Sequence, residues 1–416
     1  MLSVNEALAR VLTDVPRVGS ERVFLADALG RLLAASVRSP EDLPPWTNSA
    51  MDGYAVIAAD VPGTLHVLET IAAGAVPTVG VKRGKASRIM TGAPVPGGAD
   101  AIVMMEDTRT EGESVVIGVS ARAGQHFRRQ GSDVRTGDVV ATQGQTLTPG
   151  RIGLLASLGI PSVRVAVRPR VAILSTGDEV VEPGFPLGPG QIHSSNTHAL
   201  TALVRDAGGE PVDMGNVRDD PSALAEAFAE AARFDVVVST GGVSVGDFDH
   251  VKGVIGGGVE FWRVAMKPGK PLAYGHIGGK PVFGLPGNPV SCMVNFLQFV
   301  RPVLRTMMGD PRPFLPVVRA NVLAAIRRQP GRDEFLRVRL ERAGEHIHAI
   351  PAGGHQGSGN VRSMADAHGF LLVGANATEV SGVVNVQVYD WGFMAGEDAA
   401  YGWAAAGAAS GEAECC

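Results

Sequence analysis

The stretch Arg170–Glu179, which reads R-V-A-I-L-S-T-G-D-E, decides the fold. Its apolar run, Val171–Leu174, is followed at once by hydroxyl, glycine and acidic residues, which is the pattern of a buried strand that ends in a polar loop. From here on strands and helices alternate, which predicts an α/β domain with a buried, mostly parallel sheet. The predicted strands are 171–174, 211–217, 235–239, 259–266, 272–275 and 282–285, and the predicted helices lie near 197–207, 221–233 and 289–308.

Polar loops follow the predicted strands, each just past a strand's carboxyl end. Open α/β sheets bind their ligands at this edge. The loops are Ser175–Glu179, Arg218–Asp220, Ser239–Asp247, Lys267–Lys270 and Leu285–Ser291. Their glycines, acids, lysines and hydroxyl groups suit an anionic ligand and a metal ion.

Each loop on its own also has a purely structural explanation, because turns and helix caps use the same residues. Taken alone, Arg218–Asp220 is more typical of a cap for the helix that starts at Pro221. The lysines carry more information, since the chain has six lysines against 31 arginines and two of the six are Lys267 and Lys270. Asn288-Pro289 opens a helix, whose free N–H groups favour an anion. Together the loops indicate one ligand site.

The regions on either side of the α/β segment are rich in short β runs. The chain opens with a capping box, Ser3–Glu6, which predicts an amphipathic helix. Short runs at 67–71, 101–105 and 115–119 predict a small β domain, and Thr148-Pro149 predicts the start of a helix that ends at Gly159. Beyond Gly309, runs at 317–326, 335–340 and 383–388 predict a terminal β domain.

Composition fits a multidomain globular protein. The chain has 416 residues, 45% hydrophobic and 19% charged, with 54 glycines and 27 prolines that indicate many loops. A formal charge of −5 without a basic tract argues against nucleic-acid or membrane-surface binding. Three cysteines, Cys292, Cys415 and Cys416, cannot build a disulfide framework. We therefore expect a cytoplasmic protein with no signal peptide or membrane span.

Two catalytic motifs were weighed against this interpretation. Gly242-Val243-Ser244-Val245-Gly246 matches the nucleophile elbow of serine hydrolases, but Ser239-Thr240-Gly241-Gly242 intervene between the apolar part of its strand and Ser244, and no strong helix start follows. We favour Ser244 as a hydrogen-bond donor in a Gly-rich loop and keep the hydrolase as an alternative. The histidines lack the spacing of a catalytic zinc site.

The sequence resembles the molybdopterin molybdenumtransferase family, the MoeA proteins and the E domain of gephyrin. The matching segments are Pro44–Val56, Thr91–Pro94, Gly131–Asp133, Ser175–Glu179, Gly241–Gly246, Lys267–Pro271 and Leu285–Pro289, and the likeness runs from about residue 3 to 392. Departures are small: Ser132 stands where the pattern often has Glu, and Arg263 where some members carry Lys.

The resemblance implies a multidomain α/β protein. It implies an elongated domain of residues 1–43 and 137–169, an inserted β domain at 44–136, a three-layer α/β molybdopterin-binding domain at 170–309 and a β-barrel-like domain at 310–395. Residues 396–416 form an Ala/Gly-rich tail, which we expect to be disordered. The family is dimeric, so the resemblance also implies a homodimer with an active cleft shared between protomers.

The resemblance further implies insertion of molybdate into adenylated molybdopterin, with Mg²⁺-dependent cleavage of the phosphoanhydride and release of AMP. The implied catalytic residues are Asp52, Thr91, Asp133, Glu179, Asp219 and Asp249, of which Glu179, Asp219 and Asp249 would hold Mg²⁺. The implied molybdate- and pterin-binding residues are Ser244, Arg263, Lys267, Lys270, Pro286, Pro289, Ser291, Arg337, Ser358 and Ser363. Implied partners are molybdopterin adenylyltransferase and apo-molybdoenzymes, in transient contact.

Two further alternatives come from related functions. A molybdopterin adenylyltransferase uses a similar α/β domain, but it is a single-domain chain with Thr-Gly-Gly-Thr-Gly where this chain has Thr240-Gly241-Gly242-Val243-Ser244. A non-enzymatic scaffold is the second alternative, and the retained acidic and lysine positions argue against it.

Overall fold

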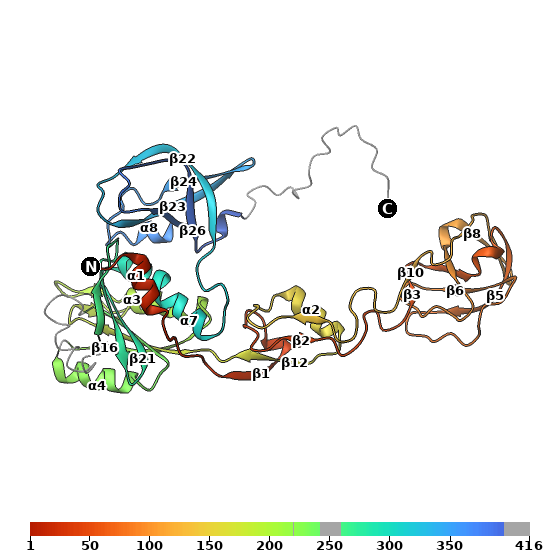
Figure 1. Ribbon diagram of the computed structural model, residues 1–416, viewed down its shortest axis with the longest axis horizontal. Coiled ribbons are helices and arrows are strands. Elements are labelled where there is room, and N and C mark those ends of the chain that lie inside the picture. The colour runs from red at the N-terminus through yellow and green to blue at the C-terminus, as the bar shows by residue number, and fades with distance from the viewer. Residues whose placement is uncertain (219, 242–258, 395–416) are drawn as a thin grey trace. The chain divides into compact units, whose positions relative to one another are not determined.

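A computed structural model of the chain describes residues 1–218, 220–241 and 259–394. The chain divides into two compact units (Figure 1). Gly19–Ala166, here called the inserted unit, interrupts a larger main unit made of Met1–Val18 and the chain from Val167 onward. Asp219, Ser244, Asp249 and the tail 396–416 lie outside the described residues.

The main unit contains a six-stranded sheet in the order β16-β13-β17-β21-β20-β18. Its strands are β13 (Arg170–Thr176), β16 (Glu210–Val217), β17 (Val236–Thr240), β18 (Val259–Arg263), β20 (Pro271–Ile277) and β21 (Lys280–Leu285). The first four in spatial order are parallel, whereas β20 runs antiparallel to both β21 and β18.

The antiparallel pairs agree with the prediction of a mostly parallel sheet, and they result from a short connection between two of the strands. A parallel pair needs a crossover of a dozen or more residues, usually a helix. Between β20 and β21 the chain has only Gly278-Gly279, both at positive φ, which makes a tight hairpin turn. β18 nevertheless runs in the same direction as β21, so its carboxyl end lies at the same edge of the sheet.

Helices cover both faces of this sheet and make three layers. Val171 and Ile173 belong to one hydrophobic cluster, which contains Leu200 of α3 (Asn196–Asp206). Ala172 and Leu174 belong to another, which contains Phe228 of α4 (Pro221–Ala231). Because successive strand residues point to opposite faces, this alternation places one helical layer on each side.

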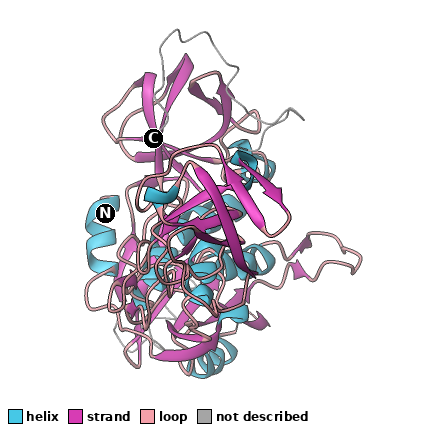
Figure 2. Ribbon diagram, turned by 90° about the vertical axis from the view of Figure 1, so that its right-hand side faces the viewer, coloured by secondary structure: helices cyan, strands magenta, loops and turns pink. Residues whose placement is uncertain are grey.

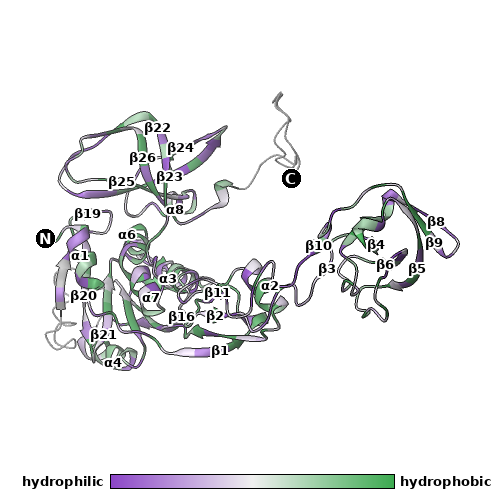
Figure 3. Cartoon of the chain, turned by 45° about the vertical axis from the view of Figure 1, so that its right-hand side comes forward, coloured by the Kyte–Doolittle hydropathy of each residue, from purple (hydrophilic) through white to green (hydrophobic). Residues whose placement is uncertain are grey.

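The long helix predicted at 289–308 is present but not uniform. It begins as α6 (Pro289–Asn295), passes through a π-helical turn η4 (Phe296–Val300) and continues as α7 (Arg301–Met307). Pro302 has no N–H to donate to the carbonyl of Gln298, which accounts for the change of pitch at this point. Every residue of η4 is buried, and Figure 3 shows apolar residues along this helix and the sheet.

The N-terminal helix α1 (Val4–Val11) carries the predicted capping box and packs in the main unit. Leu2 forms a parallel bridge with Val264, and the N–H of Ala265 donates to the carbonyl of Leu2 over 2.7 Å. Residues 1–18 are therefore integrated with the segment between β18 and β19, which comes about 260 residues later.

The C-terminal part of the main unit is a closed five-stranded barrel, seen as strands in Figure 2. Its strands are β22 (Val317–Arg327), β23 (Asp333–Ala343), β24 (His346–Pro351), β25 (Gly369–Val373) and β26 (Glu379–Val388). The pairing of β23 with β25 closes it, and the short strand β19 (Met266–Lys267) adds to β23 from outside. Helix α8 (Arg362–Ala365) lies in the connection before β25.

The inserted unit is built mainly from strands. A six-stranded sheet has the order β7-β4-β6-β5-β9-β8, and three two-stranded ribbons pair β1 with β12, β2 with β11 and β3 with β10. The strands are β1 (Ser20–Phe24), β2 (Val37–Arg38), β3 (Asn48–Ser49), β4 (Gly53–Val56), β5 (Gly63–Ile71), β6 (Lys85–Ile89), β7 (Ala101–Met104), β8 (Thr108–Glu111), β9 (Ser114–Ile117), β10 (Phe127–Arg128), β11 (Val139–Ala141) and β12 (Ser162–Ala166). Helix α2 (Pro149–Ser157) starts with the predicted cap, because the Thr148 side chain accepts from the N–H of Arg151.

Among the described residues, no helix is both long and apolar enough to cross a membrane.

Candidate functional site

A small cleft of about 60 Å³ lies at the carboxyl edge of the main-unit sheet, where the sequence placed the ligand site. It is lined by the ends of β13 and β17, the start of α3 and the loop before α6, and its residues include Thr176, Glu179, Asn196, Thr240 and Pro289. Two of the predicted residues, Glu179 and Pro289, therefore line the same cleft.

Glycine is required beside Glu179. Gly177 has φ +128°, and a Cβ there would lie 2.6 Å from Oε2 of Glu179. The exposed carboxylate thus folds back over the Gly177 backbone, whose carbonyl also accepts from Nδ2 of Asn216 at 2.9 Å. The Thr176-Gly177 turn holds this acidic side chain at the end of β13.

Asn196 ties two neighbouring loops together at the cleft. Its Nδ2 donates to Oγ1 of Thr240 and to the carbonyl of Gly287, both at 2.8 Å. Thr240 ends β17 and Gly287 follows β21, so one amide connects the loops after two central strands. Asn196 was not predicted as a site residue. The available signal was its position at the start of a predicted helix, directly after Ser194 and Ser195.

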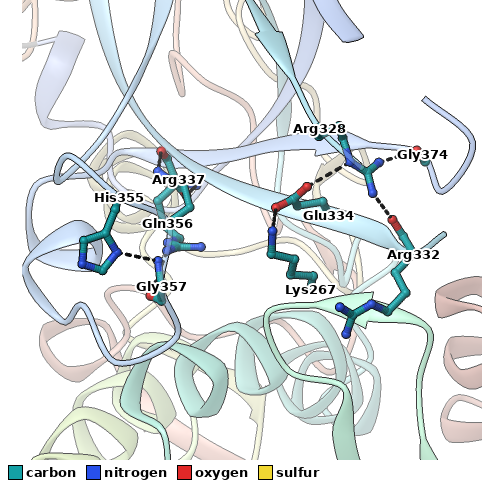
Figure 4. Close-up of polar contacts among 9 residues, drawn as sticks. All are labelled: Lys267, Arg328, Arg332, Glu334, Arg337, His355, Gln356, Gly357 and Gly374. Carbon is teal, nitrogen blue, oxygen red and sulfur yellow. Dashed lines mark hydrogen bonds and ion pairs between the residues drawn. The ribbon is translucent and has the colours of Figure 1, made fainter. Parts of the chain in front are cut away.

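The Lys267–Lys270 loop is held by buried groups (Figure 4). Nζ of Lys267 forms an ion pair with Oε1 of Glu334 at 2.8 Å. Nε of Arg328 lies 3.0 Å from Oε2 of the same carboxylate, but its N–H does not point at that oxygen well enough to form a hydrogen bond, so the contact is an ion pair. Glu334 is only 4% exposed, whereas Lys267 is about half exposed. From the other side, Nδ2 of Asn295 donates to the carbonyl of Gly269.

These cations surround a cavity of about 380 Å³. Its lining includes Lys267, Arg327, Arg328, Arg332, Glu334 and Gln356. The excess of positive over negative side chains favours an anion here. Arg328 and Glu334 escaped the sequence interpretation because β23 meets the lysine loop only through a long-range pairing of β19 with β23.

Arg337 and Ser363 are brought together in the interior beside the barrel. Arg337 is 1% exposed and its Nε donates to Oγ of Ser363 at 3.2 Å, while a second guanidinium nitrogen donates to the carbonyl of Gly357 at 3.1 Å. Gln356 exchanges hydrogen bonds with the Arg337 backbone (Figure 4). Burial lowers the pKa of Arg337, yet a guanidinium stays charged in proteins.

The loop that holds these residues also reaches the start of α6. The carbonyl of Ser358 accepts from the N–H of Val290 at 3.2 Å. Next to Val290, the side chain of Ser291 is buried. Ser291 and Ser358, predicted from distant parts of the sequence, therefore lie on directly bonded segments. Pro286 is buried, while Lys270 and Arg263 are exposed.

Asp52 and Thr91 form a pair in the inserted unit. Oδ1 of Asp52 accepts from both the hydroxyl and the N–H of Thr91, each at 2.7 Å. These two bonds hold the pKa of the exposed Asp52 carboxyl below its usual range, and the bond from the Thr91 hydroxyl has the larger effect. Asp133 is exposed in the same unit, and its N–H donates to the carbonyl of Leu43 at 3.0 Å.

Residues 1–218, 220–241 and 259–394 contain no cluster of three or more His, Cys, Asp or Glu side chains that could hold a metal ion. Glu179 is the one described member of the predicted magnesium set, because Asp219 and Asp249 lie outside those ranges.

Comparison with known proteins matches almost the whole chain. Family models match residues 2–159 as the MoeA N-terminal region (domain I and II), 172–306 as a probable molybdopterin binding domain, and 319–391 as the MoeA C-terminal region (domain IV). Molybdopterin molybdenumtransferase 2 of Mycobacterium tuberculosis is 41% identical over 410 residues, covering 94% of this chain and 100% of that protein.

Other relatives agree. The molybdopterin molybdenumtransferase of a Nostoc species is 37% identical over 407 residues, covering 93% of each chain. A crystal structure of the molybdopterin biosynthesis MoeA protein from Pyrococcus horikoshii aligns with a TM-score of 0.81 at 31% identity, covering 94% of this chain and 100% of that one.

Proposed function

Because the chain belongs to the molybdopterin molybdenumtransferase family, the MoeA proteins, we propose that it inserts molybdate into adenylated molybdopterin and releases AMP. It is a transferase that acts at a late step of molybdenum cofactor biosynthesis. The proposal that molybdate is the inserted group rests on one observation: Lys267, Arg328 and Arg332 line one cavity. Gln356, which bonds the backbone of the buried Arg337, lines the same cavity. A cluster of fixed cations suits a tetrahedral dianion such as molybdate.

We propose that these side chains bind the reactants in separate roles. Lys267 and Lys270 neutralise the oxyanion, and Arg337 with Ser363, Ser358 and Ser291 fixes the loops around it. Arg263, Pro286, Pro289 and Ser244 complete the binding surface for the pterin and its phosphate.

We propose Mg²⁺ as the metal, held by Glu179, Asp219 and Asp249. Hard carboxylate oxygens are the protein ligands that Mg²⁺ takes together with phosphate oxygens. A magnesium ion bound there supplies charge neutralisation at the phosphoanhydride. Within this set, the described carboxylate of Glu179 is exposed and lines the cleft, so it is free to take up a ligand.

The test is molybdate-dependent AMP release by the purified protein given adenylated molybdopterin, Mg²⁺ and molybdate. We expect Asp219→Asn and Asp249→Asn to fold and to lose turnover, because Asn keeps the shape and removes the charge. The matched control is Asp213→Asn on β16, an exposed residue whose Oδ1 accepts from the N–H of Gly215. Consumption of ATP to adenylate molybdopterin, in place of AMP release, would contradict the proposal.

We also propose a homodimer in which Asp52, Thr91 and Asp133 of one protomer serve the cleft of its partner. Asp52→Ala and Asp249→Ala dimers should each be inactive. After subunit exchange in equal amounts, half the dimers are mixed and each carries one intact cleft, so about a quarter of wild-type activity should return. A mixture that stays inactive after verified exchange would contradict the shared cleft.

We propose that the protein acts in the cytoplasm, as its three cysteines indicate for a reducing compartment. Transient contacts with molybdopterin adenylyltransferase and apo-molybdoenzymes would deliver the substrate and receive the product.

A further inference from the structure

Glu334 lies between two cations in the lining of the 380 Å³ cavity, here called the lysine cavity. Lys267 and Glu334 are direct neighbours across the parallel pairing of β19 with β23, and Nζ of Lys267 lies 2.8 Å from Oε1 of the carboxylate. Nε of Arg328 lies 3.0 Å from the other carboxylate oxygen, Oε2 (Figure 4). One carboxylate therefore forms an ion pair with each of the two cations.

The three side chains differ in how firmly the fold holds them. Glu334 is 4% exposed and lies on β23, which pairs with both β24 and β25 in the closed barrel. Arg328 is 7% exposed, and two of its nitrogens donate to the carbonyls of Gly374 and Arg332 at 2.8 and 2.6 Å. Lys267 is 51% exposed on a flexible four-carbon stem. Glu334 and Arg328 are thus fixed in place, and Lys267 is the member of the three that a ligand reaches.

The second cation explains how a carboxylate is compatible with an anion site. A lysine paired with a carboxylate is neutral as a pair and attracts an anion only weakly. Arg328 adds a second positive charge, so the three groups together keep one net positive charge. An ammonium group has three N–H donors, so Lys267 can bond Glu334 with one donor and an oxyanion with the others.

We propose that Glu334 is a positioning residue, which orders the ammonium group of Lys267 in the lysine cavity before the oxyanion binds, while Arg328 balances its charge. A lysine side chain that is already ordered loses less rotamer freedom when the ligand arrives, and the affinity is higher for that reason. Glu334 acts through Lys267 and does not contact the anion, whose charge has the same sign. The inference rests on the proposed function, in which Lys267 binds molybdate.

The experiment compares molybdate binding at constant net charge, by isothermal titration calorimetry. The double variant Arg328→Met with Glu334→Met removes one charge of each sign, so the cavity keeps its net charge and neither buried ion is left without its partner. We expect the Kd of molybdate to rise about tenfold, because Lys267 is no longer ordered before binding. If net charge alone set the affinity, the Kd would stay at the wild-type value.

A Lys267→Met background tests whether the effect passes through the lysine. In that background the same pair of substitutions should change the Kd of molybdate by less than about twofold, because the group that they position is gone. A shift of the 328–332 loop, which loses the hydrogen bonds of Arg328, would instead weaken molybdate in both backgrounds. The matched control is Glu341→Gln on the same strand, which breaks an exposed ion pair with Arg339 and should leave the Kd unchanged.

The kinetics of AMP release separate positioning from stability. A purely structural role of Glu334 would lower the amount of active protein, so kcat would fall and the KM for molybdate would stay the same. Loss of positioning should raise the KM for molybdate about tenfold in the double variant and leave the KM for adenylated molybdopterin within about twofold of wild type.

The inference is overturned if the double variant binds molybdate as tightly as wild type, or if molybdate weakens by the same factor in the Lys267→Met background. Failure of the proposed function looks different, because then the wild-type protein itself releases no AMP from adenylated molybdopterin. A wild-type protein that turns over, beside a double variant with unchanged Kd and KM for molybdate, rejects the positioning role alone.

Discussion

The Asp52–Thr91 pair of the inserted unit and the Arg337–Ser363 pair of the main unit are both predicted site residues held by hydrogen bonds, and they differ in exposure. Asp52 and Thr91 lie on the surface, whereas Arg337 is 1% exposed and Ser363 is fully buried. Water can replace a lost partner at the first pair but not at the second. A substitution in the exposed pair that lowers activity therefore acts on the reaction itself. A substitution in the buried pair can lower activity both by destabilising the fold and by acting on the reaction.

The largest effect is expected for Arg337→Ala. It removes the donors to Ser363 and Gly357 and opens a cavity, so the free energy of unfolding should fall by about 3 kcal/mol and AMP release should fall at least about 100-fold. Urea denaturation and the AMP assay measure the two effects. Arg337→Lys keeps the charge without the planar fork and should lose less stability. Wild-type stability in Arg337→Ala would contradict the buried network.

Glu334→Gln should have the next largest effect. It leaves Arg328, whose side chain is 7% exposed, without its counter-charge, and we expect a loss of about 2 kcal/mol in unfolding free energy. The matched control is Glu341→Gln on the same strand, because its ion pair with Arg339 is about half exposed and should be worth less than about 0.5 kcal/mol. Equal losses in the two variants would show that burial does not set the strength of these pairs.

Lys270→Ala should separate binding from stability in the main unit itself. The side chain is exposed, so Tm should stay unchanged while the KM for molybdate rises about tenfold, the effect of losing one charged contact. Lys280→Ala serves as the control, since its ammonium lies 3.8 Å from Asp235 and away from the lysine loop. An unchanged molybdate titration in Lys270→Ala would remove this residue from the oxyanion site.

The smallest effect is expected for Thr91→Val. It removes the hydroxyl bond to Asp52 and keeps the backbone bond, so the pKa of Asp52 should rise part of the way to its usual value. Because the folded pKa is depressed, the contact stabilises the protein above the usual carboxyl pKa and is lost as pH falls through the folded value. Carboxyl NMR titration of both proteins measures the shift, and identical Asp52 curves would contradict the role of Thr91.

Local patterns predicted most of the fold. The capping box of α1, the Thr148 cap of α2 and the strand before Gly177 all lie where the sequence placed them. Alternation of strands and helices predicted the layered, mostly parallel α/β sheet, but it did not give the direction of β20, which a two-residue turn makes antiparallel to β21. These features depend on residues close together in the chain.

The parts that escaped prediction depend on pairings between distant segments. Nothing near Lys267 indicates Glu334, which reaches it only because β19 adds to β23. Likewise, Asn196 precedes a helix like many capping residues, and its importance appears only when the loops after β17 and β21 are placed beside it. Side chains buried by such pairings have no local sequence signal.

The integration of α1 into the main unit has a consequence for synthesis on the ribosome. Leu2 and Val11 contact Val264 and Tyr274, residues that are translated about 260 positions later. At about 5 to 20 residues per second, α1 waits about 10 to 50 s for these partners, and a helix this short is marginal alone. Every strand of the inserted unit pairs within residues 19–166, so that unit can fold during the wait. The segment that carries α1 is thus translated long before its partners and reaches its native position only after them, and a nascent chain stalled before Val264 would expose the apolar face of α1 to chaperones.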